Sequence, residues 1–291
     1  MEMMNSGEAA AYLRLSERKL YELVATGAIP CSKVTGRWVF PRDALDRWVL
    51  SGLQRPPGFT PAEPPPIVGG SQDDLLTWCL RQSGSGLALL TEGTQRGIER
   101  LREREVIAAA IHYHSGDDDP NVAAMTAMRD FSDALLVGFA RREQGLVLPT
   151  GNPRGVTDFD HVVAEGLSIA IRQPGAGARM LLDQLLTSRG LAVEMIRRGP
   201  SVCLTGPEVA AAVREGNADC GIATRAVASG AGLHFVPIAW EGFDLAMRQR
   251  SFFTPAVQAL VAFLRQPGVR AQADVLGGYD LSPAGTIRYV A

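Results

Sequence analysis

The sequence predicts an α/β protein with a small helical domain at the N-terminal end and a larger domain built on a mostly parallel sheet. After residue 66, short apolar runs alternate with amphipathic stretches of helical period, which is typical of βαβ units. Before residue 50, the apolar residues have the spacing of short helices. Residues 51–66, which connect these two parts, are rich in proline and show neither the helical nor the strand periodicity, so we expect an extended linker there.

Composition and length are those of a globular protein with more than one domain. The chain has 291 residues, of which 46% are hydrophobic and 21% charged, and its net charge of -2 favours no class of partner. No signal peptide opens the sequence, and no apolar run reaches the roughly 18 residues of a membrane span, so we expect a cytoplasmic protein. The four cysteines form no CxxC pair, which argues against a zinc site or a disulfide framework.

The first fifty residues have the pattern of two short helices joined by a tight turn, which is a helix-turn-helix. The apolar faces of the two helices are Ala9, Ala10 and Leu13, then Leu20, Leu23 and Val24. Ser16 is a suitable N-cap for the second helix, and Gly27 closes it. A small hairpin around Thr35-Gly36 and a last helix from Pro41 through Trp48 follow.

This block resembles the excisionase-like, MerR-related winged helix-turn-helix family over about residues 5–50. The resemblance is carried by Glu8-Ala9-Ala10, Leu13, Ser16, Tyr21, Leu23, Gly27, Ile29-Pro30, Gly36-Arg37-Trp38 and Asp43-Ala44-Leu45-Asp46-Arg47-Trp48. It implies a DNA-binding domain whose second helix enters the major groove while the hairpin contacts the backbone as a wing. The DNA contacts that it implies are Ser16, Arg18, Lys19, Tyr21, Lys33, Arg37 and Arg42. Where many members carry Thr and Arg on the recognition helix, this chain has Lys19 and Glu22, which leaves the base preference open.

In the larger domain, apolar runs and amphipathic stretches predict the following elements. Strands are expected near residues 66–68, 87–90, 106–111, 134–140, 145–149, 167–171, 219–223 and 233–238. Helices are expected near residues 73–82, 95–103, 178–188 and 205–215, with a last helix over 255–264.

The segment from Leu167 to Gly190 is the clearest candidate for a ligand site. It has the pattern of a strand, a turn containing Gly175 and Gly177, and a helix start, with Arg172 and Arg179 on either side of the turn. Free backbone N–H groups at a helix start, together with the helix dipole, can bind an anion. An ordinary βα turn with solvated arginines is the alternative interpretation.

The order of motifs in this domain resembles the type II periplasmic-binding-protein (PBP) fold, in the form that bacteria attach to helix-turn-helix regulators and that is related to molybdate- and tungstate-binding proteins. The resemblance covers about residues 67–250. It is carried by Gly70-Ser71-Gln72-Asp73, Ala109-Ala110-Ile111-His112, Arg142-Glu143-Gln144-Gly145-Leu146, Gly151-Asn152-Pro153, the turn from Arg172 to Arg179 with Leu182-Asp183, Gly216-Asn217-Ala218-Asp219-Cys220-Gly221-Ile222, Phe235-Val236-Pro237 and Glu241-Gly242-Phe243-Asp244-Leu245. The two resemblances and the proline-rich segment between them together imply a winged helix-turn-helix domain at 1–50, a linker at 51–66, and a PBP-like domain at 67–291. Lobe 1 would hold about 67–145 and 241–291, and lobe 2 about 146–240.

The resemblance further implies that loops from both lobes close on one small ligand. The residues that it places at this cleft are Ser71, Gln72, Ser85, Thr94, Arg172, Gln173, Gly175, Ala176, Gly177, Arg179, Thr205 and Thr224. Hydroxyls, arginines and helix starts favour a compact oxyanion such as molybdate or tungstate as the effector, with no other cofactor. Ala176 and Ala178 stand where a GSGT-type turn has Ser and Thr, and Thr205 and Phe243 stand where relatives often have His and Tyr. These departures keep a larger organic anion as an alternative.

No arrangement of residues typical of catalysis is evident. His112 and His114 are two residues apart, so in a strand they would share a face and could bind a metal, but no third ligand is nearby in sequence. We therefore expect no catalytic and no metal-binding residues. The chain as a whole predicts a one-component transcriptional regulator that acts as a homodimer on DNA and senses a small anion. An enzyme that acts on a small organic anion, and an architectural DNA-binding protein whose large domain only dimerises, are the alternatives.

Overall fold

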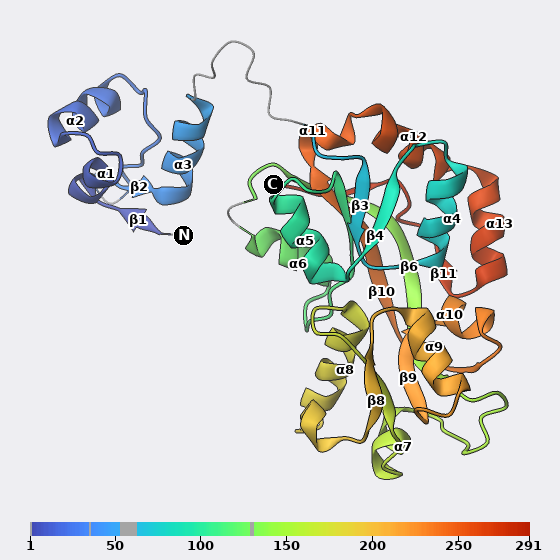
Figure 1. Cartoon of the computed structure of the whole chain (residues 1–291). Helices are drawn as coiled ribbons and strands as arrows, with labels where there is room; N and C mark the ends of the chain where they lie inside the picture. Colours follow the sequence, from blue (N-terminus) through green and yellow to red (C-terminus); the bar gives the residue numbers. More distant parts are fainter. Residues whose placement is uncertain (1, 35, 53–62, 129–130) are drawn as a thin grey trace. The chain divides into compact units, whose positions relative to one another are not determined.

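The computed structural model describes residues 2–34, 36–52, 63–128 and 131–291. The chain divides into two compact units, residues 1–62 and 63–291, and each is described here by itself (Figure 1). Most of the predicted proline-rich linker, residues 53–62, lies outside the described residues.

The first unit contains the predicted helices. They are α1 (Ser6–Tyr12), α2 (Glu17–Ala25) and α3 (Arg42–Ser51), with the short strands β1 (Met3–Met4) and β2 (Phe40–Pro41) paired antiparallel. Ser16 is the N-cap of α2, as predicted, because its hydroxyl accepts a hydrogen bond from the Lys19 N–H at 3.2 Å. Of the predicted hairpin, Thr35 lies outside the described residues, but an antiparallel bridge joins Ser32 and Val39 on either side of it. The core of this unit consists of Met4, Ala9, Ala10, Leu20, Ile29, Phe40 and Leu45.

The second unit has the predicted α/β architecture. Its strands are β3 (Ile67–Gly70), β4 (Ala88–Thr91), β5 (Ala108–Ile111), β6 (Ala134–Leu148), β7 (Ile169–Arg172), β8 (Arg198–Cys203), β9 (Cys220–Thr224), β10 (His234–Arg248), β11 (Tyr279–Asp280) and β12 (Ile287–Val290). Its helices are α4 (Asp74–Gln82), α5 (Thr94–Arg102), α6 (Pro120–Ala127), α7 (Phe159–Ala164), α8 (Gly177–Thr187), α9 (Gly206–Arg214), α10 (Arg225–Gly230), α11 (Gln249–Phe252), α12 (Pro255–Phe263) and α13 (Pro267–Leu276), with a 3-10 turn at Val193–Met195. The sheet is mixed rather than mostly parallel, because β6 and β10 pair antiparallel with each other and with their neighbours.

Two long antiparallel strands, β6 and β10, run through both lobes of this unit (Figure 1). The strand order is β4-β3-β5-β10-β6-β9-β7-β8, with β11 and β12 also paired to β6. Within β6, Arg142 pairs with β11 of the first lobe while Gln144 pairs with β9 of the second, so the chain crosses between the lobes at these residues. The two strands predicted at 134–140 and 145–149 are therefore one strand. The polar residues between them stay in the ladder because β10 pairs with them throughout.

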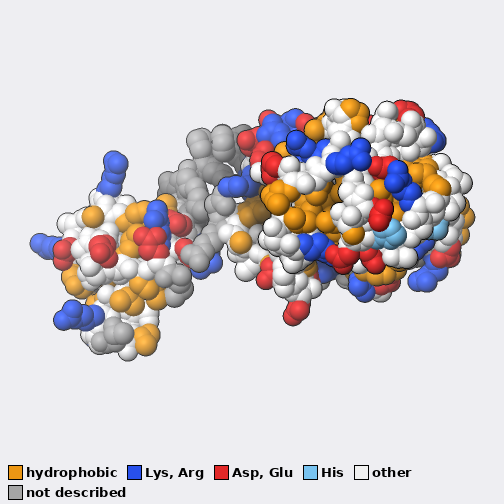
Figure 2. Space-filling model, turned by 90° about the horizontal axis from the view of Figure 1, so that it is seen from below, with side chains coloured by type: hydrophobic (Ala, Val, Ile, Leu, Met, Phe, Trp, Pro, Cys, Tyr) orange, Lys and Arg blue, Asp and Glu red, His pale blue; other side chains and the backbone are white. Residues whose placement is uncertain are grey.

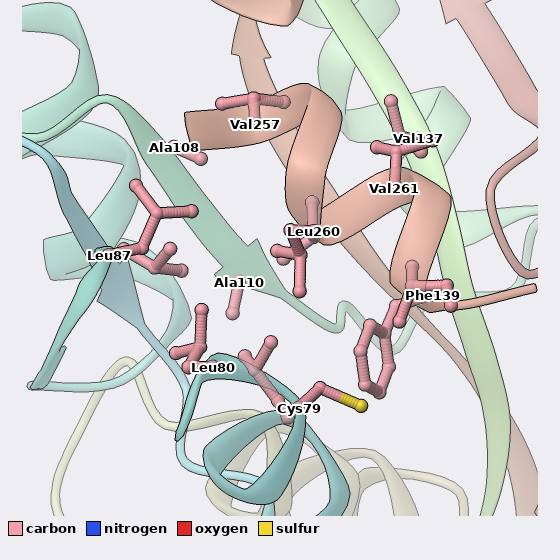
Figure 3. Close-up of a cluster of buried hydrophobic side chains, with 14 of the residues drawn as sticks. Cys79, Leu80, Leu87, Ala108, Ala110, Val137, Phe139, Val257, Leu260 and Val261 are labelled. Carbon is pink, nitrogen blue, oxygen red and sulfur yellow. The ribbon is translucent and has the colours of Figure 1, made fainter. Parts of the chain in front are cut away.

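Helices cover both faces of the sheet in each lobe. In lobe 1, buried side chains of α4 and α12 pack against β5 and β6, as Figure 3 shows for Cys79, Leu260, Ala110 and Phe139. A second cluster around Ile98, Leu101, Met125 and Phe131 fills the face covered by α5 and α6. Lobe 2 has one cluster under α7 and α8 and another under α9 and α10. This two-sided burial explains why most strands read as continuous apolar runs.

The helix predicted over residues 255–264 is not the last element of the chain. Pro267 begins a further helix, α13, and β11 and β12 then return to the edge of lobe 1. This return places Tyr279 opposite Arg142 in the sheet. Within the described part of the chain, none of the helices combines the length and the apolar character that crossing a bilayer requires.

Candidate ligand-binding site and DNA-binding surface

A cavity of about 30 Å³, partly open to solvent, lies between the two lobes. Because the carboxyl ends of the parallel strands in each lobe face this cavity, the loops that follow β3, β5, β7 and β9 meet there. The lining residues are Ser71, Gln72, Asp73, Asp74, His112, Arg142, Gln144, Arg172, Ala176, Gly177, Ala178, Gly206, Ala223, Thr224 and Val227. The Gln95 N–H of lobe 1 donates to the Gly175 carbonyl of lobe 2 at 3.2 Å, so the two lobes are in direct contact.

Lobe 2 contributes a positive wall to the cavity. The Arg172 guanidinium donates from Nε to the Gln173 side chain at 3.1 Å and from Nη2 to the Leu204 carbonyl at 2.9 Å, but among the described residues it has no carboxylate partner. Burial, and secondly repulsion by Arg142, lower its pKa to about 10. Beside it, helix α8 begins without a side-chain cap, and the N–H groups of Gly177 and Ala178 donate to no described residue. This wall offers several hydrogen-bond donors and an unpaired cation to a ligand.

A buried ion network holds the opposite wall. Arg142, 2% exposed, donates to the carboxylates of Asp73 and Glu241, and Tyr279 donates its hydroxyl to Asp73 at 2.9 Å. Burial disfavours the charged form of Glu241. The Arg142 charge and the hydrogen bond from His114 nevertheless hold the pKa of this carboxyl below its ordinary value. Arg142 is thus neutralised by its two carboxylates, whereas Arg172 is not.

His112 connects this network to the helix start of lobe 2. Its Nδ1 accepts a hydrogen bond from Arg142 Nη2 at 2.9 Å, and burial lowers its pKa well below 6.5. The ring is therefore neutral at pH 7 with its hydrogen on Nε2, where no described group accepts it. A Cβ on Gly177 would lie 1.8 Å from this Nε2, so only glycine allows α8 to approach the ring.

The sequence-predicted ligand residues fall into two groups. Ser71, Gln72, Arg172, Ala176, Gly177 and Thr224 line the cavity, whereas Ser85, Thr94, Gln173, Gly175, Arg179 and Thr205 do not. The members of the second group have structural partners. Thr94 is fully buried between Ser71 and the His112 backbone, Arg179 pairs with Asp183, and Thr205 caps α9 through Glu208.

Several lining residues were not predicted as ligand contacts. They are Asp73, Asp74, His112, Arg142, Gln144, Ala178, Gly206, Ala223 and Val227. Arg142 and Gln144 did carry a signal, since these two long polar side chains share one face of a strand whose residues on either side of the polar segment 141–144 are apolar. Such a pattern in a strand buried on both faces indicates a polar site rather than a solvated edge.

His112, His114 and Glu241 bring potential metal-ligating atoms within 4.8 Å of one another. The arrangement opposes a cation, however. The hydrogen bond that His112 Nδ1 accepts from Arg142 leaves the hydrogen on Nε2, the atom that would have to bind the metal. Glu241 already accepts hydrogen bonds from Arg142, Gln144 and His114.

The predicted DNA-contacting residues lie on the first unit, where Lys and Arg project on several sides with acidic side chains between them (Figure 2). The side chains of Arg18 and Lys19 on α2 are 91% and 56% exposed, and both lie near the Glu22 carboxylate, at 3.6 and 3.1 Å. Tyr21 donates to the Ser6 hydroxyl, and the Ser16 hydroxyl caps α2. Arg37 is exposed, Lys33 lies over the Trp38 ring, and Arg42 pairs with Glu2 at 3.0 Å.

Comparison with known proteins agrees with this geometry. Residues 73–265 match the model of the PBP superfamily domain, and residues 3–52 match that of a helix-turn-helix domain. The uncharacterized protein YvgK of Bacillus subtilis is 21% identical over 299 residues, covering 96% of both chains.

Two solved structures have a similar fold at low sequence identity. The tungstate ABC transporter protein from Geobacter sulfurreducens is 13% identical, with a TM-score of 0.52, over 72% of this chain and 97% of its own. An H2O2-bound mutant of OxyR from Corynebacterium glutamicum is 13% identical, with a TM-score of 0.51, over 94% of this chain and 89% of its own. The chain belongs to the PBP superfamily and carries a helix-turn-helix domain at its N-terminal end.

Proposed function

We propose that this protein is a one-component transcriptional regulator whose two-lobed domain senses a small anion and thereby controls DNA binding by its helix-turn-helix domain. The observation that carries the anion part is the positive wall of the cavity. Arg172 is largely buried without a carboxylate partner among the described residues, and two free N–H groups of α8 lie beside it. An anion would accept hydrogen bonds from the Arg172 guanidinium and from both N–H groups, and it would offset the electrostatic cost of burying Arg172.

The nature of the anion follows from the sequence only in part. An oxyanion of the molybdate or tungstate type is the effector that the family resemblance favours, and a small organic anion is the alternative. The cavity is small, with a volume of about 30 Å³, which supports a compact ligand in either case.

The regulator acts in the cytoplasm as a homodimer, because helix-turn-helix proteins commonly read two-fold operators with two copies. The effector closes the lobes, and the changed geometry alters how the two DNA-binding domains are presented. Light scattering on the purified protein measures the oligomeric state, and a monomer at micromolar concentration would contradict this part.

The second candidate is an enzyme acting on a small organic anion, since His112 and Glu241 are titratable groups close to a cavity. The geometry favours the regulator, because Glu241 is committed to Arg142, Gln144 and His114. Among the described residues, the neutral His112 has no acid-base partner at hydrogen-bond distance other than Arg142. The protein is thus proposed as non-enzymatic.

Thermal unfolding with a panel of anions tests the proposal. The panel contains molybdate, tungstate, sulfate, phosphate and small carboxylates, and a ligand that binds only the folded state raises the unfolding midpoint. DNA selected from genomic fragments by the full-length protein then shows whether the stabilising anion changes its affinity. Anion binding with no DNA binding under any condition would refute the regulator.

A further inference from the structure

Three lining residues of the cavity each have a buried side-chain atom without a hydrogen-bond partner among the described residues. These atoms are Gln72 Oε1, Gln144 Oε1 and His112 Nε2. Buried polar atoms are rarely left unpaired, because each lost hydrogen bond to water costs free energy. Unpaired atoms on residues that line one cavity therefore indicate the groups that a ligand would supply there.

Gln144 provides an acceptor whose orientation is fixed. Its amide nitrogen donates to Glu241 Oε1 at 3.1 Å, and a carboxylate can only accept, so the amide oxygen must point the other way. The residue is 2% exposed, which leaves that oxygen without water. A ligand satisfies it only by donating a hydrogen.

His112 provides the matching donor. Its Nε2 carries the hydrogen because Nδ1 accepts from Arg142, and it lies 3.9 Å from the same Glu241 oxygen that Gln144 contacts. The two lining side chains thus approach the same carboxylate oxygen, one with a free donor and the other with a free acceptor. Asp74, a partly buried lining residue of lobe 1 without an ion-pair partner among the described residues, adds a second acceptor.

We infer that the effector is an anion that carries its own O–H or N–H donor, such as a hydroxy- or aminocarboxylate or hydrogenphosphate. Its anionic oxygens meet Arg172, His112 Nε2–H and the start of α8, and its donor meets Gln144 Oε1. Molybdate, tungstate and sulfate offer acceptors alone and would leave this oxygen unpaired. The inference rests on the proposed anion sensing and favours the donor-bearing alternative over the molybdate type.

Matched ligands that differ by one donor test the inference on the full-length protein. Succinate, malate and aspartate form one set, propionate, lactate and alanine a second, and sulfate and phosphate at pH 7.5 an inorganic pair. Dissociation constants come from calorimetry or from the thermal shift. We expect a donor-bearing member of at least one set to bind roughly tenfold or more tightly than its donor-free partner. The set in which this occurs identifies the source of the donor.

A substitution separates recognition from structural damage. In Gln144→Met the ratio of affinities within the discriminating set should fall toward one, whereas mere loosening of the site lowers both affinities together. Gln258→Met, which makes the same exchange at an exposed glutamine of α12 that does not line the cavity, is the control and should retain the ratio. Donor-free anions, molybdate included, binding as tightly as their partners would overturn this inference and leave anion sensing intact. No binding of any member would overturn both.

Discussion

Replacing Arg172 by glutamine should make the unliganded protein more stable while removing its response to the effector. The fall of the Arg172 pKa from 12.5 to about 10 corresponds to roughly 3 kcal/mol against the charged form in the empty cavity. The two hydrogen bonds that the guanidinium makes to Gln173 and the Leu204 carbonyl offset about 2 kcal/mol of this cost. The unliganded variant should therefore gain about 1 kcal/mol, a rise of roughly 2–4 °C for a domain of this size.

The liganded protein should show the opposite ranking. With the effector at about 100 times its dissociation constant, the wild type gains roughly 2.7 kcal/mol from binding. If losing the charge weakens binding about 100-fold, the variant gains only about 0.4 kcal/mol at the same concentration. Differential scanning calorimetry with and without the best anion of the panel measures both effects.

Arg179→Gln is the matched control, because Arg179 lies on the other side of the same turn, in the first turn of α8, but pairs with Asp183 and does not line the cavity. This control should keep the full ligand response. An Arg172→Gln protein that is less stable without ligand and retains the wild-type shift would refute the assignment of Arg172 as the anion-binding cation.

The remaining predictions concern the lobe contact, the buried histidine and the recognition helix. Gly177→Ala should weaken effector binding by roughly ten- to a hundredfold, because the added Cβ strains the closed cleft by ~1–3 kcal/mol. The control Gly268→Ala should bind normally, since no atom lies within 4 Å of the added Cβ. Equal affinities of the two variants would show that the lobes do not close as described. Because unfolded His112 takes up a proton near pH 6.5 and the folded residue does not, acidification from pH 7.5 to 5.5 should cost the wild type about 1 kcal/mol more than His112→Gln in urea unfolding. Identical pH profiles would contradict its buried neutral state. Glu22→Gln should tighten DNA binding in fluorescence anisotropy by releasing the two cations near its carboxylate, and weaker binding would argue against α2 as the contact helix.

Local patterns in the sequence were sufficient for much of the fold and for one wall of the cavity. The helix start at Gly177 and the flanking Arg172 follow from a strand, a glycine turn and an amphipathic run that are contiguous in the chain. Ser16 was identifiable as a cap for the same reason, since its partner is three residues away. Such features need only neighbouring residues and the periods of helix and strand.

The other wall depends on pairs that are distant in sequence. Arg142 and Glu241 are 99 residues apart, and Tyr279 and Asp73 are 206 apart. They meet because β6 and β10 pass through both lobes in antiparallel register and because β11 returns after α13. The sequence interpretation instead divided β6 at its polar residues, since local polarity alone cannot distinguish a loop from a strand that carries a buried ion network.

The central claim is that occupancy of the cavity changes DNA binding. Fluorescence anisotropy of the full-length protein on a selected DNA fragment, with and without a saturating amount of the best anion, measures this coupling directly. The account predicts a change in DNA affinity of roughly 5–150-fold, as for coupling energies of 1–3 kcal/mol, and no change in Arg172→Gln. Equal DNA affinity of the wild type with the cavity empty and saturated would contradict it.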